Sequence, residues 1–275
     1  MLDEPSDALM LRVLASGSGG NCAVLRVPCP GGARLVLLDA GLSPRRTRAL
    51  LAESGLSGVP IAAILLTHLD HDHWNAGWAN ALPGGCEMIV HASHRGRAGR
   101  EGALYGRARV IDADLDVCGL RVRAVLGEHD ELGVAAYRLD APGLGSLGWA
   151  TDLGRVPDEL VSLFAGVDVL GIESNYCPRM QASSDRPQFL KRRITGGRGH
   201  LSNEESADAA SRIDPRGARV LLHLSRQCNT PHLARAAHLS SPTPVTVTSQ
   251  HAPSAWVRVG DPVPHRAPPT LAPHG

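Results

Sequence analysis

The chain has 275 residues, a hydrophobic content of 43% and a formal net charge of +1 at neutral pH. This length and composition suffice for one large α/β domain or two small ones. The near-zero net charge excludes a protein-wide basic field, so binding of nucleic acid or of a membrane surface would require a local basic patch.

The cysteines and the hydropathy pattern bear on the cellular compartment. Six cysteines are scattered along the chain without a Cys-x-x-Cys pair, which favours reduced thiols over a disulfide framework. The acidic N-terminus does not resemble a secretory signal, and no apolar run approaches the roughly eighteen residues of a membrane span. We therefore expect a soluble, cytoplasmic protein without a membrane partner, whose oligomeric state the sequence leaves open.

Apolar runs alternate with helix-like segments along the chain, and this pattern predicts an α/β layered fold. The expected strands cover residues 8–14, 23–27, 34–38, 61–66, 87–91, 110–112, 120–126, 133–139, 146–150, 167–173 and 220–224. The expected helices cover residues 44–54, 157–164 and 203–212, while 94–106 is expected to be irregular and 178–199 a long polar segment. Residues 245–250 and 255–259 would form a closing hairpin, and the Pro-rich stretch 261–275 a disordered tail.

The densest group of ionisable side chains lies directly after the apolar run 61–66. Residues 68–73 contain five ionisable side chains in six positions, namely His68, Asp70, His71, Asp72 and His73. Burying them beside a strand without a cation would be costly. Imidazole and carboxylate are ligands that first-row divalent metals prefer, so the run predicts a metal site.

Three further candidate ligands follow predicted strands. His129 follows strand 120–126, Asp152 follows strand 146–150, and His223 lies at the end of strand 220–224. Loops at strand ends are where a rigid sheet can hold ligands accurately. Any one of these residues alone could equally be a turn or core residue, but their joint occurrence after residues 68–73 favours a shared site.

The run Thr67–His73 resembles the Thr-His-x-His-x-Asp-His signature of the metallo-β-lactamase fold hydrolases. The resemblance implies a four-layer αββα sandwich over residues 1–260, with metals held at one edge between two sheets. It departs from the signature at Asp70, where the second histidine is usual. His71 has no place in the signature, and it is either a bystander, which we favour, or a substitute for the missing imidazole.

The resemblance implies two metal sites in this chain. His68, Asp70, His129 and Asp152 match the first site, and Asp72, His73, Asp152 and His223 match the second, so that Asp152 would bridge them. Two divalent ions about 3.5–4 Å apart can activate a shared water and clamp both the attacking and the leaving oxygen. Mn²⁺ or Zn²⁺ is expected, and the oxygen ligand of Asp70 shifts the preference away from Zn²⁺ and towards Mn²⁺ or Fe.

A narrower resemblance covers most of the chain and is to the YycJ/WalJ-type branch, which is linked to bacterial DNA exonuclease activity. It is carried by segments 14–21, 38–41, 151–154, 172–175, 190–194, 199–204 and 223–225. Within it, Gly199-His200-Leu201-Ser202 resembles the Gly-His-Ser motif of tRNA 3′-processing nucleases. This implies that His200 acts on the scissile phosphate, while Asp72 both binds metal and orients the attacking group; a helix-capping role for His200 is the alternative.

Segment 178–199 suggests the substrate. It contains six basic residues and one acidic residue, Asp185. Such a patch binds phosphate backbones in a salt-dependent way, and we expect Arg192 and Arg193 to contact DNA that is single-stranded or has a free end. A solvated surface is the simpler explanation of a charged run.

Two other functions remain open at this point. A hydrolase of small esters, thioesters or lactones could use the same metals and would not need the basic segment. A non-catalytic scaffold with a damaged metal site would account for Asp70, but it leaves the remaining ligands unexplained.

Overall fold

The computed structural model describes residues 7–104 and 107–260 and places them in two seven-stranded sheets. The first sheet, in spatial order, contains β14 (Val257–Val259), β1 (Leu9–Ala15), β2 (Cys22–Val27), β3 (Arg34–Leu38), β4 (Ile61–Leu66), β5 (Glu87–His91) and β6 (Arg107–Ile111). The second contains β13 (Val245–Val247), β12 (Ala218–Leu222), β11 (Val169–Glu173), β10 (Gly145–Ala150), β9 (Val134–Ala141), β8 (Leu120–Gly127) and β7 (Asp114–Val117). The tail predicted for residues 261–275 lies outside the described residues.

The inner faces of the two sheets pack against each other and form the central core. Leu11, Leu25 and Leu65 of the first sheet belong to one buried cluster with Tyr137 and Trp149 of the second. Buried strands such as Ile61–Leu66 have apolar residues on both faces, because helices cover the outer side of each sheet. The strand 61–66 was predicted from this continuous apolar run, and the structure confirms its bounds.

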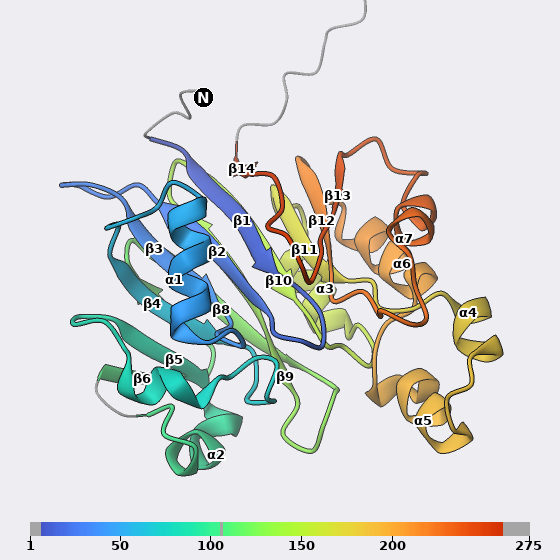
Figure 1. The fold of residues 1–275 in the computed structure, drawn as a ribbon. Helices are drawn as coiled ribbons and strands as arrows, with labels where there is room; N and C mark the ends of the chain where they lie inside the picture. Colours follow the sequence, from blue (N-terminus) through green and yellow to red (C-terminus); the bar gives the residue numbers. More distant parts are fainter. Residues whose placement is uncertain (1–6, 105–106, 261–275) are drawn as a thin grey trace, which may run out of the picture.

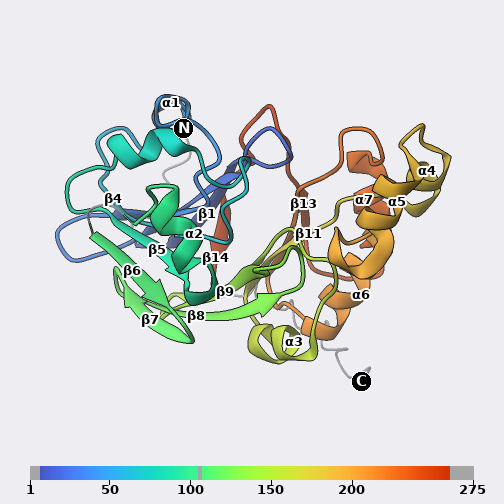
Figure 2. The same ribbon diagram turned by 90° about the horizontal axis from the view of Figure 1, so that it is seen from below.

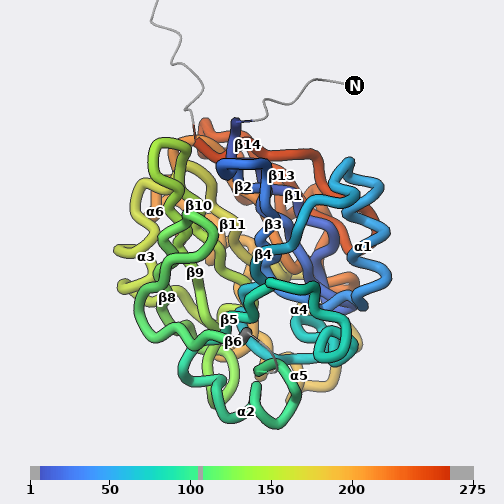
Figure 3. Tube along the Cα trace, turned by 90° about the vertical axis from the view of Figure 1, so that its left-hand side faces the viewer, coloured from blue at the N-terminus to red at the C-terminus, as the bar shows by residue number. Residues whose placement is uncertain are grey.

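Helices complete a four-layer αββα sandwich (Figures 1 and 3). Helix α1 (Pro44–Glu53) packs Leu50 and Leu51 on the first sheet, and α3 (Asp158–Phe164) packs Leu160 and Phe164 on the second. The remaining helices are α2 (Arg95–Arg100), α4 (Pro178–Ser183), α5 (Gln188–Arg193), α6 (Asn203–Ile213) and α7 (Pro231–Ala237), with short turns η1 (Ala76–Asn80), η2 (Ala92–His94) and η3 (Ile194–Arg198). None of the helices in the described residues is long and apolar enough to cross a bilayer.

The hairpin predicted for residues 245–259 is wrong. Strand β13 pairs in parallel with β12 of the second sheet, whereas β14 pairs antiparallel with β1 of the first sheet. The two segments therefore extend different sheets. Local alternation of apolar residues indicates a strand but does not indicate its partner, and each segment here pairs with an available sheet edge.

The parallel strands carry their following residues to one edge of the sandwich. Strands β10, β11 and β12 are parallel neighbours, and β8 runs in the same direction because β9 is antiparallel to both β8 and β10. Their carboxyl ends consequently lie at one edge of the second sheet. The end of β4 joins this edge, since Tyr137 of β9 donates a hydrogen bond of 2.6 Å to the carbonyl of Leu66 and the amide of Ala135 donates to the carbonyl of Thr67.

A segment containing α4, α5 and η3 lies beside this edge. In Figures 1 and 2 it occupies the side of the molecule away from α1, next to α6 and α7. The long polar segment predicted for residues 178–199 is thus partly helical. It is anchored at its start by the amide of Cys177, which donates to the carbonyl of Cys228.

Candidate metal centre

The loop after β4 is held by a buried carboxylate on the neighbouring strand. Asp39, directly after β3, accepts hydrogen bonds from the amide of Thr67 at 2.8 Å and from its hydroxyl at 2.9 Å. Its second oxygen lies 2.8 Å from Nδ1 of His73. Asp39 therefore fixes both the start of the loop and the orientation of one imidazole, as a carboxylate behind a metal-binding histidine usually does.

Three residues of the site leave their strands in the left-handed backbone region. Asp39, Asp152 and His223 have φ values of 63°, 54° and 51°. Aspartate tolerates this region better than most residues, and a left-handed residue turns the chain sharply at the strand end. The side chains of Asp152 and His223 are consequently buried in the site, at 2% and 4% exposure, instead of following the strand outward.

The first group of candidate ligands contains His68, His129 and Asp152, whose ligand atoms lie within 4.8 Å of one another. Nδ1 of His68 contacts the Thr67 hydroxyl at 3.0 Å, and Nδ1 of His129 lies 2.9 Å from the carbonyl of Gly199. Because Nδ1 of each ring makes these contacts, Nε2 is the nitrogen of each ring that could bind a cation.

Asp70 lies at the margin of this first group. Its Oδ2 is 3.9 Å from Nε2 of His68, and its Oδ1 accepts a hydrogen bond of 2.9 Å from Arg97. One carboxylate oxygen is therefore engaged by an arginine while the other faces the group. His71 points away from the group, with its side chain 90% exposed.

The second group contains Asp72, His73 and His223, and Asp152 also reaches it. Nε2 of His73 is 2.9 Å from Oδ2 of Asp152 and 3.7 Å from Oδ2 of Asp72. Nδ1 of His223 is 2.7 Å from Oδ1 of Asp152. The carboxylate of Asp152 thus has one oxygen towards each of these histidines and contacts both groups, as a bridging ligand would.

Burial and neighbouring charges set the protonation of these groups in the absence of a cation. Burial, then the charge of His73, lowers the pKa of His68 well below its usual value, so this imidazole is neutral. Burial would also lower the pKa of His73, but Asp152 and Asp39 outweigh it and raise that pKa well above its usual value. Burial would raise the pKa of Asp152, but His223 and His73 hold it well below its usual range.

The donor set fits divalent cations. Nδ1 of His223 is buried without a hydrogen-bond partner among the described residues, although it lies 2.7 Å from Asp152, because the direction of this contact is not that of an N–H···O bond. A buried imidazole nitrogen and a carboxylate oxygen turned towards a common space are suited to a metal ion. The ligand types, imidazole nitrogen and carboxylate oxygen, match those of first-row metals.

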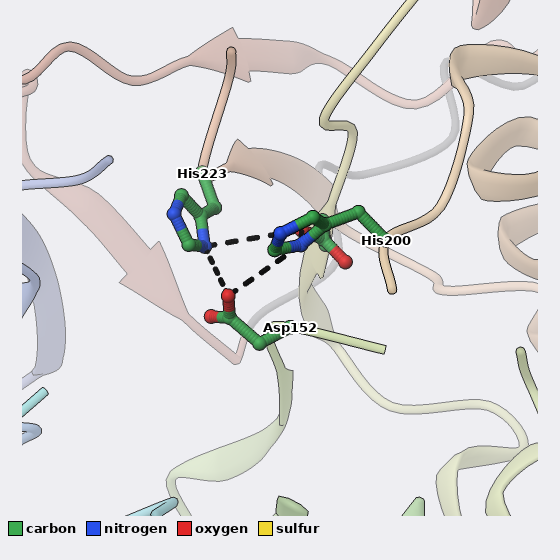
Figure 4. A group of neighbouring side chains, drawn as sticks. Asp152, His200 and His223 are labelled. Carbon is green, nitrogen blue, oxygen red and sulfur yellow. Dashed lines mark hydrogen bonds and ion pairs between the residues drawn. The ribbon is translucent and has the colours of Figure 1, made fainter. Parts of the chain in front are cut away.

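A second constellation adjoins the metal-binding groups and was only partly predicted. Nδ1 of His200 lies 2.7 Å from Oε1 of Glu173. Figure 4 shows the same imidazole beside Asp152, whose Oδ1 is 3.6 Å from that nitrogen. Glu173 is fully buried, and its other oxygen accepts from the amides of Leu153 and Leu201. Burial and the charge of Asp152 raise the pKa of Glu173 to about 8, while burial lowers the pKa of His200.

The groups open into a cavity of about 1260 Å³. Its walls include the candidate ligands His68, Asp70, Asp72, His129, Asp152 and His223, together with His200. Segment 184–194 forms another wall and contributes Arg186 and Arg193. Arg192 and Arg193 are both exposed, and only Arg193 is among the lining residues.

Several residues of the site were missed from the sequence. Asp39 and Glu173 end apolar strands and carry no local sign of their contacts. Asn21 lies in a Gly/Ser turn and places its side-chain nitrogen 2.8 Å from Nε2 of His73. Arg186 was counted in the basic segment but not singled out; its guanidinium bonds Gln227, Gln181 and the hydroxyl of Ser225.

A two-sheet sandwich with helices on both outer faces and His/Asp groups at one edge defines the architecture of a metal-dependent hydrolase. Residues 34–224 match the family model described as "Beta-lactamase superfamily domain". The chain is 30% identical over 239 residues to the exodeoxyribonuclease WalJ of Streptococcus pneumoniae, which covers 81% of this chain and 84% of that protein. It is 29% identical over 235 residues to the exodeoxyribonuclease YycJ of Bacillus anthracis, covering 82% and 86%. The chain belongs to the β-lactamase superfamily, in the branch of WalJ and YycJ.

Solved structures confirm the fold. The metallo-β-lactamase fold protein YhfI from Bacillus subtilis superposes with a TM-score of 0.67 at 16% identity, covering 90% of this chain and 99% of that chain. Human tRNase Z, short form, gives a TM-score of 0.62 at 16% identity, with coverage of 92% and 100%. The sandwich implied by the Thr67–His73 run is therefore confirmed, and the superfamily implies a divalent-metal centre.

Proposed function

We propose that this protein is a metal-dependent phosphodiesterase that removes nucleotides from DNA that is single-stranded or has a free end. The observation that carries the proposal is the cavity, in which two candidate metal-binding groups share one wall and Arg186 and Arg193 line another. The printed activity of the relatives WalJ and YycJ supports the same substrate class.

Within this proposal the ligands divide as the family signature implies. His68, Asp70, His129 and Asp152 would hold one divalent ion, and Asp72, His73, Asp152 and His223 the other. When bound, two such ions, Mn²⁺ or Zn²⁺, provide Lewis-acid stabilisation of the phosphoryl oxygens and lower the pKa of water. The residues of the chain have the separate tasks of orienting the reactants and moving protons.

Asp72 and His200 are the proposed catalytic residues. Asp72 is 9% exposed and lines the cavity, where its carboxylate can orient the attacking water. His200 is held at Nδ1 by Glu173, which leaves Nε2 to face a phosphoryl or leaving oxygen. Oε1 of Glu173 lies 2.7 Å from Nδ1, so the pair can carry the proton that Nε2 delivers as the phosphorus–oxygen bond breaks.

The arginines of the cavity wall would bind the phosphate backbone. Arg186 is held in place by three side-chain hydrogen bonds, including 3.2 Å to Ser225 near the ligand His223. Burial is the main cause that lowers the pKa of His200, and the charge of the nearby Arg186 lowers it further. A fixed guanidinium beside the proposed catalytic histidine is suited to a phosphate next to the scissile one. Arg193 extends the same wall.

The test compares substrates and variants on the purified, metal-loaded protein. We expect metal-dependent shortening of end-labelled single-stranded DNA and hydrolysis of a generic phosphodiester, with salt-sensitive DNA affinity. His200→Ala should lower turnover at least a hundredfold with little change in DNA affinity, whereas the matched control His71→Ala should leave both nearly unchanged. Hydrolysis of a generic ester without salt-sensitive DNA affinity would instead identify a small-molecule hydrolase.

A further inference from the structure

Arg97 of helix α2 contacts both loops that carry histidines of the first metal-binding group, the loop after β4 with His68 and the loop after β8 with His129. Its guanidinium donates to Oδ1 of Asp70 at 2.9 Å, to the carbonyl of Leu69 at 2.7 Å and to Glu101 at 2.7 Å. It also lies 3.8 Å from Asp130, the residue after His129. A guanidinium presents its donors in a rigid fork, so one side chain fixes several acceptors at once.

The contact with Asp70 decides how that carboxylate can be used. With Oδ1 bound to Arg97, only Oδ2 remains turned towards Nε2 of His68, at 3.9 Å. The carboxylate can then contribute a single oxygen to a cation and cannot rotate to chelate it with both. Asp70 is also about one third exposed, so without Arg97 its side chain would have access to solvent and to other rotamers.

Arg97 also affects the charge that Asp70 brings to the first metal-binding group. The family signature has a neutral histidine at the position of Asp70, so the aspartate adds one negative charge to a wall that already contains Asp72 and Asp152. Arg97 adds one positive charge at hydrogen-bond distance. Arg97 therefore offsets part of the charge that Asp70 adds to this wall, while its own charge is shared with Glu101 at 2.7 Å.

The same helix region braces the second loop of the group. Nε2 of His94, directly before α2, lies 2.9 Å from the carbonyl of Gly133 at the end of loop 128–133. Arg97 approaches Asp130 within that loop. The loop that carries His129 is consequently held at two points, by His94 of η2 at Gly133 and by Arg97 of α2 at Asp130.

We propose that Arg97 is the positioning residue of the first metal site, fixing Asp70 as a one-oxygen ligand and offsetting part of its charge. This inference rests on the proposed metal centre and adds to it a residue outside the ligand set. Residues that hold metal ligands by hydrogen bonds typically change metal affinity by about 10–100-fold when they are replaced. We expect an effect of this size on one of the two ions.

The experiment measures metal binding directly, by competition with a chromophoric chelator and by the visible spectrum of the Co²⁺-loaded protein. Arg97→Ala should weaken one of two Mn²⁺ or Co²⁺ ions about 10–100-fold and alter the Co²⁺ spectrum, whereas Arg95→Ala on the same helix should not. In an Asp70→Asn background, Arg97→Ala should have less than a threefold further effect, because its partner charge is gone. Arg97→Lys, which keeps the charge without the fork, should fall in between, and thermal unfolding of the metal-free variants checks that they are folded.

Each outcome is informative. If the wild type binds two ions and Arg97→Ala binds them as Arg95→Ala does, the assignment of Arg97 is refuted while the metal centre stands. If Arg97→Ala weakens the ion equally in the Asp70→Asn background, Arg97 acts only through the fold of the loops and the inference fails. If the wild type binds no divalent ion, the proposed function fails and this inference with it.

Discussion

The substitution Asp39→Asn tests whether the carboxylate that contacts Nδ1 of His73 is needed for metal binding. Asparagine tolerates the left-handed backbone at this position, where φ is 63°, and its carbonyl oxygen can keep the two hydrogen bonds from Thr67. The amide nitrogen would then face Nδ1 of His73, 2.8 Å away in the wild type. A donor at this place favours the tautomer of His73 that carries its proton on Nε2, the nitrogen directed at Asp152.

The size of the effect follows from the lost bond. A hydrogen bond to a charged group is worth about 1.5–3 kcal/mol, which corresponds to roughly 10–150-fold in metal affinity. The assay is chelator competition on the variant, with Asp168→Asn as the matched control; Asp168 is a buried carboxylate that accepts from the amide and hydroxyl of Ser146. Unchanged metal affinity in Asp39→Asn, or an equal loss in Asp168→Asn, would refute the role of Asp39 behind His73.

Three further predictions test the ligand set, the basic wall and the response to acid. Asp152→Ala should lose both ions and all activity, whereas His71→Ala, whose side chain is 90% exposed, should keep both, as metal analysis would show. Arg193→Ala should reduce the slope of log DNA affinity against log salt by roughly 0.7–0.9, while Arg192→Ala should have a smaller effect in the same titration, because Arg192 is not among the residues that line the cavity. Burial, then the charge of Arg219, lowers the pKa of His238 to about 4, so its neutral form stabilises the fold at neutral pH and this contribution is lost as the pH falls from about 6.5 to 4. The loss is about 3 kcal/mol, and His238→Leu should remove this part of the acid destabilisation seen in urea unfolding at the two pH values.

The elements and most of the candidate ligands could be predicted because their signals are local. The apolar run before Thr67 and the apolar strand before Asp152 place these residues at strand ends, and parallel strands bring such ends together. The partners behind the ligands could not be found in this way. Glu173 ends an apolar strand and meets His200 only through the fold, and Arg97 lies in a Gly/Arg-rich stretch without periodicity that was expected to be irregular but is helical.

The same limit applies to strand pairing and to the direction of neighbouring side chains. The pairing of β13 and β14 depends on which sheet edges are open, which is a property of the whole domain. Arg192 and Arg193 are indistinguishable in sequence, yet on a short helix neighbouring residues point about 100° apart, and only Arg193 lines the cavity.

The placement of segment 178–198 has a consequence for how this protein could change over evolutionary time. The candidate ligands lie on strand ends of the sandwich, while Arg186 and Arg193 of the cavity wall lie on one contiguous stretch beside it (Figure 2). Side-chain substitutions in that stretch can change what lines the cavity while the candidate ligands stay on the strand ends. Under the proposed function, substrate preference and metal chemistry would be encoded in separable parts of the gene, and exchanging the side chains of this stretch between relatives would be a way to change the substrate.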